Sequence, residues 1–476
     1  MHLKNISLFI LIMAIVWLST PIFANKLMIE QFISPETCGG CHSEIYDQWH
    51  NSMHNLAHKD PVYLEISRFF ISELTDNEEI AEAESCVKCH TPVGYITGYP
   101  KKSSDDRNKV PEIATHGIQC DYCHSATGAD KMYNNGLILR PGNGEDNPGV
   151  KRGPRKDAQS DFHETEFSKF HTDSNICGTC HNVKHVSFGI NLETTFDEWE
   201  KGPYNSKDPA KRITCQGCHM YQRVGVPATG STECPENKGA SVDDGPIRDH
   251  IFTHNFVGGN SFIPESFDRA DKSKTNINDK SKTNINDKSN IDDKSKIDNK
   301  IKIDDKAKMA EERLKNAATL SIDDSKIKDG ELSIIITNSG AGHDLPTGLT
   351  DIRQMWLEIT VLDEKGDQIF SSGKLDKNGY LPDNAIIFNT IYGDEKGKPV
   401  QNIAKARVIL KTKRIPPLES VTEKIKFTQK DFKYININVK LLYRSASKKL
   451  LDKVAGKDKF VLPVITMAEI DKKIKP

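Results

Sequence analysis

The sequence has no excess of charge of either sign. Its 65 lysine and arginine residues are balanced by 67 aspartate and glutamate residues, which gives a formal net charge of −2. Proteins that bind nucleic acid usually carry a basic patch or stripe, and the composition shows no such footprint. We therefore predict no nucleic-acid partner.

Long apolar runs are also scarce, and the run at the N-terminus is short. It extends from Ile6 to Leu18, after Lys4 and before the small residue Ala24, which is the order of a secretory signal peptide. A membrane-spanning helix needs about 20 apolar residues. We predict a signal peptide over residues 1–24 and export to the periplasm or cell envelope of a bacterial cell. A retained membrane anchor is the alternative, because Ile22 stands where a small residue is usual.

The cysteines lack the irregular spacing of a disulfide framework. An exported chain with eleven cysteines would normally suggest disulfides, but only Cys234 stands outside a repeated frame, and we interpret it as an incidental free thiol. The other ten form five C-x-x-C-H motifs, which we number in chain order. They are Cys38, Cys41 and His42; Cys86, Cys89 and His90; Cys120, Cys123 and His124; Cys177, Cys180 and His181; and Cys215, Cys218 and His219.

The C-x-x-C-H frame is the attachment site of c-type haem. On a helical turn, positions i, i+3 and i+4 share one face. The two thiols can therefore form thioethers while the imidazole reaches the iron from the same side. Zinc and thiol-redox sites also use C-x-x-C, but a histidine follows all five copies. We predict five covalently bound c-type haems with these histidines as proximal iron ligands.

The remaining histidines are numerous enough to supply the sixth iron ligands. Of sixteen in the chain, five are proximal and His2 lies in the signal segment, which leaves ten for five positions. This surplus favours two histidines on most or all irons. We prefer His163 to His171, and His343 either ligates iron or bonds backbone in a Pro-Gly turn. The predicted distal ligands are His54, His116, His163, His254, His343 and His250.

His54 illustrates the geometry. It follows His42 by twelve residues, which corresponds to about 18 Å if the segment is helical. It therefore serves a haem attached elsewhere, and such cross-ligation couples haem binding to folding. We interpret His50 and His58 as solvated or propionate-bonding side chains and His185 as a residue that supports a ligand.

The second half of the chain changes in composition. "DKSKTNIN" at 271–278 recurs at 279–286 and then degenerates into a charged segment without aromatics. Such a segment cannot bury enough apolar surface to order itself. We predict a linker over 265–318 that ends in a short helix, "KMAEERLKNAATL", with Met309, Leu314 and Leu320 on its apolar side.

Beyond the linker, the hydrophobic period shifts to two. About seven segments with alternating apolar residues and intervening turns predict an antiparallel β-sandwich over residues 319–476. The predicted fold class is thus multidomain α+β: a mainly α-helical multihaem cytochrome c domain over 25–264, followed by the sandwich.

Several segments occur in a recognisable order between about residues 36 and 260: "CGGCHSEIYDQWHNSMH", "SCVKCHTPVGY", "GIQCDYCH", "GPRKDAQSDFH", "NICGTCHNV", "ETTFDEWEKGPY", "ITCQGCHM" and "HNFVGGN". This layout resembles the multihaem cytochromes related to the tetrahaem cytochrome that accepts electrons from hydroxylamine oxidoreductase. The resemblance implies that His54 caps the fourth haem and that the haems pack in alternating stacked and tilted pairs. "NSGAGHDLPTG" with "DIRQMWLEITVLD" likewise resembles a β-domain appended to many exported multihaem cytochromes.

The sequence also departs from that family. The tetrahaem relative has no fifth motif, and its second haem has an open sixth site, which His116 could fill here. The chain lacks a C-x-x-C-K frame, the attachment site of the lysine-ligated active haem in pentahaem nitrite reductases.

Two functions follow from these features. The first is electron transfer along mostly bis-histidine haems between redox protein partners, a donor and an acceptor. The alternative is an oxidoreductase that acts on a small nitrogen or sulfur compound, of the hydroxylamine, nitrite or tetrathionate type, at one open haem. His50, His171 or His185 would then be the proton donors. A structural or adhesive role for the sandwich would leave the haems unexplained.

Overall fold

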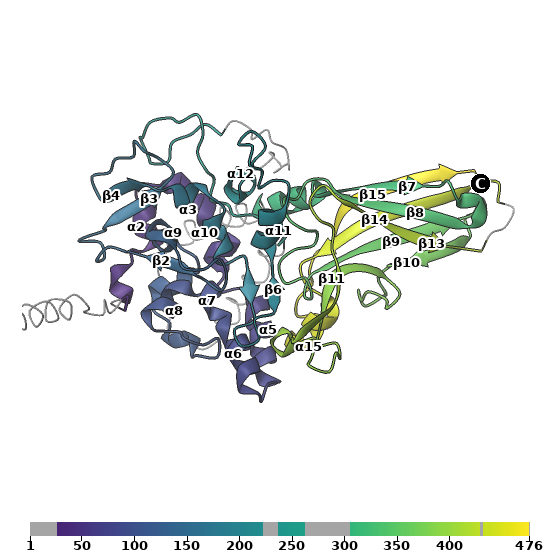
Figure 1. Ribbon diagram of the computed structural model, residues 1–476, viewed down its shortest axis with the longest axis horizontal. Helices are drawn as coiled ribbons and strands as arrows, with labels where there is room; N and C mark the ends of the chain where they lie inside the picture. The colour runs from purple at the N-terminus through teal and green to yellow at the C-terminus, as the bar shows by residue number, and fades with distance from the viewer. Residues whose placement is uncertain (1–25, 222–236, 262–304, 429–431, 476) are drawn as a thin grey trace, which may run out of the picture.

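The computed structural model describes residues 26–221, 237–261, 305–428 and 432–475. The predicted signal peptide, Cys234 and the repeats of the linker lie outside the described residues. A helical part and a β-rich part lie side by side along the long axis of the molecule (Figure 1). The predicted α+β fold class is therefore confirmed. None of the helices in the described part of the chain is long and apolar enough to cross a membrane.

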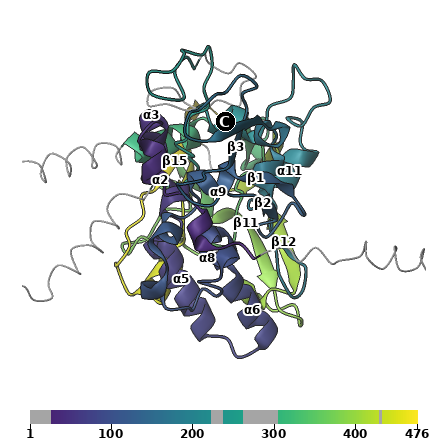
Figure 2. The ribbon, with the colours of Figure 1, turned by 90° about the vertical axis from the view of Figure 1, so that its left-hand side faces the viewer.

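The helical part consists of short helices joined by loops and three small strand pairs. Figure 2 views this part end on, with α2 and α9 above α5 and α6. Its elements are η1 (Ile29–Gln31), α2 (Pro35–Gly39), α3 (Ser43–Trp49), α4 (Met53–Leu56), α5 (Pro61–Ser72), α6 (Asn77–Ser85), α7 (Val87–His90), α8 (Pro92–Thr97), η2 (Arg107–Lys109), η3 (Glu112–His116), α9 (Cys120–His124), β1 (Ala126–Ala129), β2 (Leu137–Leu139), β3 (Val150–Gly153), β4 (Glu164–Phe167), η4 (Lys169–Thr172), α10 (Asn175–Gly178), β5 (Val183–Lys184), β6 (Asn191–Glu193), α11 (Thr195–Lys201) and α12 (Cys215–His219).

The motif helices are short, and two of them, α2 and α12, begin at a side-chain cap. Ser34 accepts a hydrogen bond from the Glu36 amide, with Pro35 at the first helical position of α2, and Thr214 caps α12 by accepting from the Gly217 amide. Side chains of this kind satisfy amides that have no partner within the helix. A single turn suffices to present the two thiols and the imidazole of each motif.

The segment around His54 is not one continuous helix, and this premise of the distance estimate was wrong. Helix α3 ends at Trp49, and Asn51 adopts a left-handed backbone conformation with φ of 61°. Helix α4 then begins after Ser52, whose side chain accepts a hydrogen bond from the Asn55 amide. The cap at Ser52 thus starts a second helix, and His54 does not continue the helical spacing of α3.

The β-rich part consists of a six-stranded and a three-stranded antiparallel sheet. The larger has the order β12-β11-β9-β14-β15 with β10 paired to β9, and the smaller has the order β13-β8-β7. The two sheets contain nine strands in the described residues, where the sequence predicted about seven. The strands are β7 (Ala318–Asp323), β8 (Glu331–Asn338), β9 (Gln354–Leu362), β10 (Gln368–Ser372), β11 (Ile386–Gly393), β12 (Val408–Lys413), β13 (Ser420–Lys426), β14 (Ile435–Arg444) and β15 (Ile465–Ile474), with η5 (Ile327–Asp329), η6 (Ile403–Lys405) and α15 (Lys448–Ala455) in the connections.

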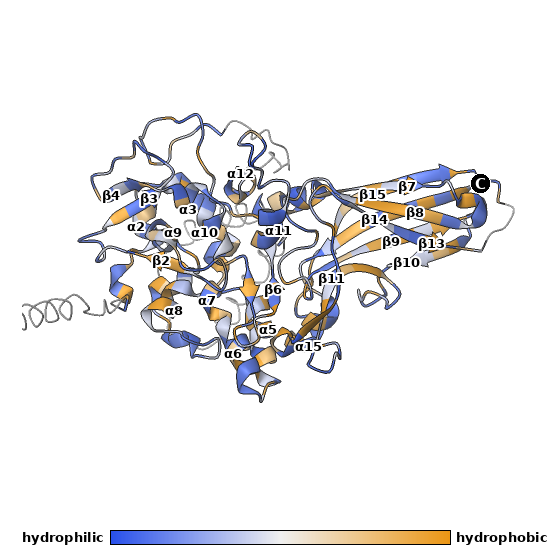
Figure 3. Ribbon diagram, viewed as in Figure 1, coloured by the Kyte–Doolittle hydropathy of each residue, from blue (hydrophilic) through white to orange (hydrophobic). Residues whose placement is uncertain are grey.

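The two sheets enclose the largest core of the molecule. Along β8, every second residue is buried, as expected for a strand with one face on a core, and Figure 3 shows hydrophobic residues along the strands of this part. Ile334 and Ile336 from the smaller sheet join Ile359 and Val439 from the larger in one buried cluster. This packing confirms the predicted sandwich.

The short helix before the sandwich covers residues 305–315. Met309 and Leu314 are buried as expected, but the assignment of Leu320 to this helix was wrong. Leu320 lies in β7 and pairs with Ile336 of β8. Strand pairing with a neighbouring segment has overridden the helical spacing.

The two parts share a continuous apolar interface. Helix α5 buries Ile66 and Phe70 in the same cluster as Ile403 of the sandwich. Asn402 Nδ2 donates to the Phe70 carbonyl at 3.0 Å, and the Tyr392 hydroxyl donates to the Leu192 carbonyl at 3.0 Å. The sandwich is therefore docked on the helical part.

Replacement of Ile359 by Ala removes a fully buried side chain from the sandwich core. We expect the free energy of unfolding to fall by about 3 kcal/mol because of lost apolar burial and the remaining cavity. Ile409→Ala is the matched control, since that side chain is 48% exposed and should change stability by less than about 0.5 kcal/mol. Urea unfolding followed by circular dichroism measures both, and equal losses would contradict the core assignment.

Candidate haem-binding site

The five motifs surround one extended cavity. Its volume is about 1530 Å³, and its lining includes every cysteine and histidine of the five C-x-x-C-H frames. Single small-molecule sites usually occupy about 300–1,000 Å³, so this cavity offers room for more than one group. The sandwich contributes part of the wall through Leu349, Arg353 and Ala446.

Neighbouring motifs approach each other through their thiols. The contacts bring the first motif beside the third, the second beside the fourth, and the fourth beside the fifth. The thiol pairs are Cys38 with Cys120, Cys89 with Cys180, and Cys177 with Cys215. Motifs that are distant in the sequence thus become neighbours, and the fourth motif lies beside two others.

Four of the five proximal imidazoles face a second imidazole across the cavity. An imidazole nitrogen lies about 2 Å from a bound metal, so two rings on opposite sides of one iron have centres roughly 6 Å apart. The observed ring-centre distances match this value. They are 6.5 Å for His42 and His163, 6.3 Å for His54 and His181, 6.3 Å for His124 and His254, and 6.4 Å for His219 and His343.

Hydrogen bonds orient these rings. A carbonyl can only accept, so each Nδ1 on a carbonyl carries the proton, and Nε2 keeps its lone pair for a metal. Seven of the ligand-candidate imidazoles show this arrangement. The acceptors are the carbonyls of Ser241 for His42, Ala57 for His90 (3.0 Å), Arg152 for His124 (2.6 Å), Val257 for His219 (3.1 Å), Glu164 for His163 (3.0 Å), Phe252 for His254 (3.0 Å) and Asp344 for His343 (3.0 Å).

The second motif differs from the other four. Among the described residues, no histidine ring faces His90 at the spacing of the four pairs. Instead, Tyr63 stacks on the His90 ring with centres 3.7 Å apart and planes inclined by 12°. Tyr63 follows Asp60, which caps α5 by accepting from the Val62 amide at 2.9 Å. Nothing in the sequence distinguished Tyr63 from an ordinary packing residue of α5.

Two of the predicted distal ligands lie elsewhere. His116 packs 6.4 Å from the Trp49 ring, and its Nε2 lies 3.7 Å from a carboxylate oxygen of Glu36. It therefore lies beside the first motif and not opposite His90. His250 stacks on Tyr221 with ring centres 4.0 Å apart. Neither histidine forms one of the four imidazole pairs.

His171 and His254 both approach the ring of His124. His171 lies closer, at 5.7 Å, but its Nε2 donates to the Cys123 carbonyl at 2.9 Å. His254 keeps Nε2 available because its Nδ1 is bonded to backbone. The hydrogen bonds thus distinguish the two rings where sequence spacing did not.

The remaining histidines have other contacts. His185 is buried and donates from Nε2 to the Ala404 carbonyl of the sandwich at 2.9 Å. His58 bonds the Thr91 hydroxyl through Nδ1 at 2.7 Å, and burial lowers the pKa of His58 to about 3, which keeps it neutral. His50 stacks on a tyrosine, with ring centres 5.6 Å apart.

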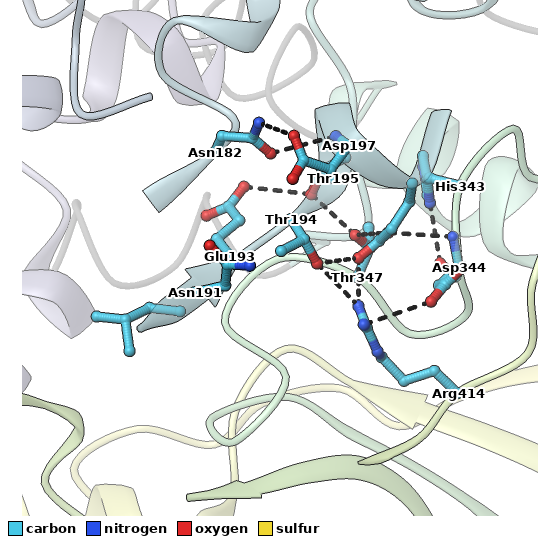
Figure 4. A network of polar contacts seen from close by, with 12 residues as sticks. Asn182, Asn191, Glu193, Thr194, Thr195, Asp197, His343, Asp344, Thr347 and Arg414 are labelled. Atoms are coloured by element: carbon cyan, nitrogen blue, oxygen red, sulfur yellow. Dashed lines mark hydrogen bonds and ion pairs between the residues drawn. The ribbon is translucent and has the colours of Figure 1, made fainter. Parts of the chain in front are cut away.

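His343 reaches the cavity from the sandwich, and a partly buried polar cluster holds its loop (Figure 4). Glu198 of α11 accepts from the Asp344 amide at 3.1 Å and from the Thr347 hydroxyl at 2.6 Å. Arg414 pairs with Glu198 and lies 3.5 Å from the Asp344 carboxylate. Burial raises the pKa of Asp344 to about 6. Sequence spacing carried no signal for this cluster, because its members come from three separate segments.

Comparisons with known proteins find similarity to cytochromes. Residues 37–125 match the family described as "Cytochrome c554 and c-prime". The structure resembles that of a penta-heme cytochrome c552 from Thermochromatium tepidum, with a TM-score of 0.56 and 18% identity over 94% of this chain and 100% of that chain. No curated protein sequence matches the chain. The chain is thus similar to multihaem c-type cytochromes, in sequence over its first motifs and in fold over nearly its whole length.

The two rings near His124 make a matched pair of variants. His254→Ala should convert one low-spin haem to high-spin, because it removes the imidazole whose Nε2 is available. His171→Ala should leave the spin states unchanged, since its Nε2 is bonded to backbone. Low-temperature electron paramagnetic resonance, normalised to bound haem, measures both, and the reverse result would contradict this assignment.

His343→Ala tests the contribution of the sandwich. It should convert a different haem to high-spin, because the ring opposite His219 is lost. Added imidazole should restore the low-spin signal. His250→Ala is the control, as that ring stacks on Tyr221 outside the four pairs. An unchanged spectrum in the His343→Ala protein would show that the sandwich supplies no ligand.

Proposed function

We propose that this chain is an exported pentahaem c-type cytochrome that carries electrons between redox protein partners. The five C-x-x-C-H motifs would attach the haems through their ten cysteines, and His42, His90, His124, His181 and His219 would be the proximal ligands. Bound haem supplies reversible one-electron exchange. The similarity to multihaem cytochromes supports this reading.

The four imidazole pairs are the observation that carries the proposal. His163, His54, His254 and His343 lie at the spacing of a second ligand, and three of them hold the ring by an Nδ1 bond to backbone. A haem iron with two histidine ligands has no free position for a substrate. Such a site exchanges electrons without binding a reactant, which favours electron transfer as the main activity.

The thiol contacts support a connected path. The first motif adjoins the third, and the fourth adjoins both the second and the fifth. The first and third motifs would therefore be one group of neighbours, and the second, fourth and fifth another. A partner that delivers electrons at one motif could draw on the haems of its neighbours.

The second motif supports the alternative function, the oxidation or reduction of a small nitrogen or sulfur compound at one open haem. No described histidine faces His90 at ligand spacing, whereas Asp60, Tyr63 and Arg353 line the cavity there. Burial raises the pKa of Asp60, so this carboxyl can hold a proton above its ordinary range. An arginine and a protonated acid suit a small anionic reactant. The predicted donors His171 and His185 are instead bonded to backbone carbonyls.

Two measurements on the same protein test both proposals. The haem content of the mature protein, measured as the pyridine haemochrome, should be five per chain. Electron paramagnetic resonance of the oxidised protein should then show four low-spin haems and one high-spin haem. Fewer than five haems would contradict the pentahaem assignment. Five low-spin haems would eliminate the open site and leave electron transfer as the function.

A further inference from the structure

His181 differs from the other proximal histidines in the partner of its Nδ1. The proximal imidazoles of the first, second, third and fifth motifs bond backbone carbonyls. Nδ1 of His181 instead lies 3.5 Å from Oε1 of Glu193. A carboxylate carries a full negative charge where a carbonyl carries a partial one. The fourth motif is therefore the one proximal position among the described residues with an anionic partner.

The position of Glu193 follows from the local fold. It ends β6, whose pairing with β5 sets Val183 opposite Glu193, two residues beyond His181. The Thr195 hydroxyl donates to Glu193 Oε1 at 3.3 Å. The Glu193 side chain is 16% exposed. The carboxylate is thus held beside the imidazole by a strand register and by a neighbouring hydroxyl.

A second contact links this carboxylate to the sandwich. The hydroxyls of Thr195 and Thr347 lie 2.8 Å apart, and Thr347 donates to Glu198 in the cluster that holds the His343 loop (Figure 4). The sandwich therefore places Thr347 beside the residue that donates to Glu193. This arrangement connects the surroundings of the fourth motif to those of the fifth.

We propose that Glu193 is a positioning residue that lowers the reduction potential of the haem on the fourth motif. This inference rests on the proposed function. The Nδ1–H of a metal-bound imidazole points away from the metal. A carboxylate that accepts a hydrogen bond from this N–H increases the electron donation of the ring to the metal and favours the oxidised metal. The fourth motif adjoins the second and the fifth. A haem of low reduction potential at the fourth motif would pass an electron to one of these neighbours instead of retaining it.

Glu193→Gln tests the inference, because glutamine keeps an acceptor oxygen and removes the charge. In a potentiometric titration of the full haem-loaded protein, the midpoint of one haem should rise. The expected shift is at least about tenfold in the reduction equilibrium, which is about 59 mV for one electron. The low-spin paramagnetic signal of the same haem should also shift, whereas a purely structural role would leave both unchanged.

Asp197→Asn is the matched control. Asp197 is a nearby carboxylate, 27% exposed, that accepts from Asn182 Nδ2 at 2.6 Å and does not contact a proximal imidazole. The Asp197→Asn protein should show midpoint potentials that differ from those of the unaltered protein by much less than the shift in the Glu193→Gln protein. An equal shift in the two variants would assign the effect to general charge and overturn the proposal.

Glu193→Asp covers the case in which glutamine disturbs haem attachment. Aspartate keeps the charge with a shorter reach, so the midpoint should lie between those of the unaltered and Glu193→Gln proteins. A variant that retains five haems and shows no shift in any midpoint overturns the role of Glu193 and leaves the proposed function intact. An unaltered protein with fewer than five haems overturns the proposed function itself.

Discussion

The structure depends on histidine pairs that bridge distant segments of the chain across one cavity. His42 meets His163, His54 meets His181, His124 meets His254, and His219 meets His343. The helices that carry the motifs are one turn long and would be marginal alone. Their arrangement is therefore maintained by contacts at long range, and ligation across these pairs would join haem binding to folding.

The sandwich completes this arrangement and is more than an appended domain. Its docking combines an apolar cluster around α5 with a partly buried ionic cluster of Glu198, Arg414 and Asp344. The ionic cluster holds the loop of His343 beside the fifth motif.

The five sites are chemically unequal although their motifs are alike. In four sites, a second imidazole lies opposite the proximal one across the cavity. The second site instead has Tyr63 stacked on its proximal ring. The fourth site, one of the four, also has the Glu193 carboxylate beside its proximal ring. These differences lie entirely in residues outside the C-x-x-C-H frames. Five identical motifs thus lie in different environments, four with a second imidazole opposite the proximal one and one without.

The sequence by itself determined whatever depends on local spacing. Each C-x-x-C-H frame spans only five residues of the sequence, and the alternation in β8 and β9 predicted the sandwich. Tertiary structure alone decided which imidazole faces which. His116 was as plausible from the sequence as His254, and His250 was a further candidate, but the break at Asn51, the cap at Ser52 and the docking of the sandwich direct other rings into the cavity. Helical and strand periods report which side a residue faces within its own element. The partner across a cavity depends on how loops and domains pack, and no local period records that.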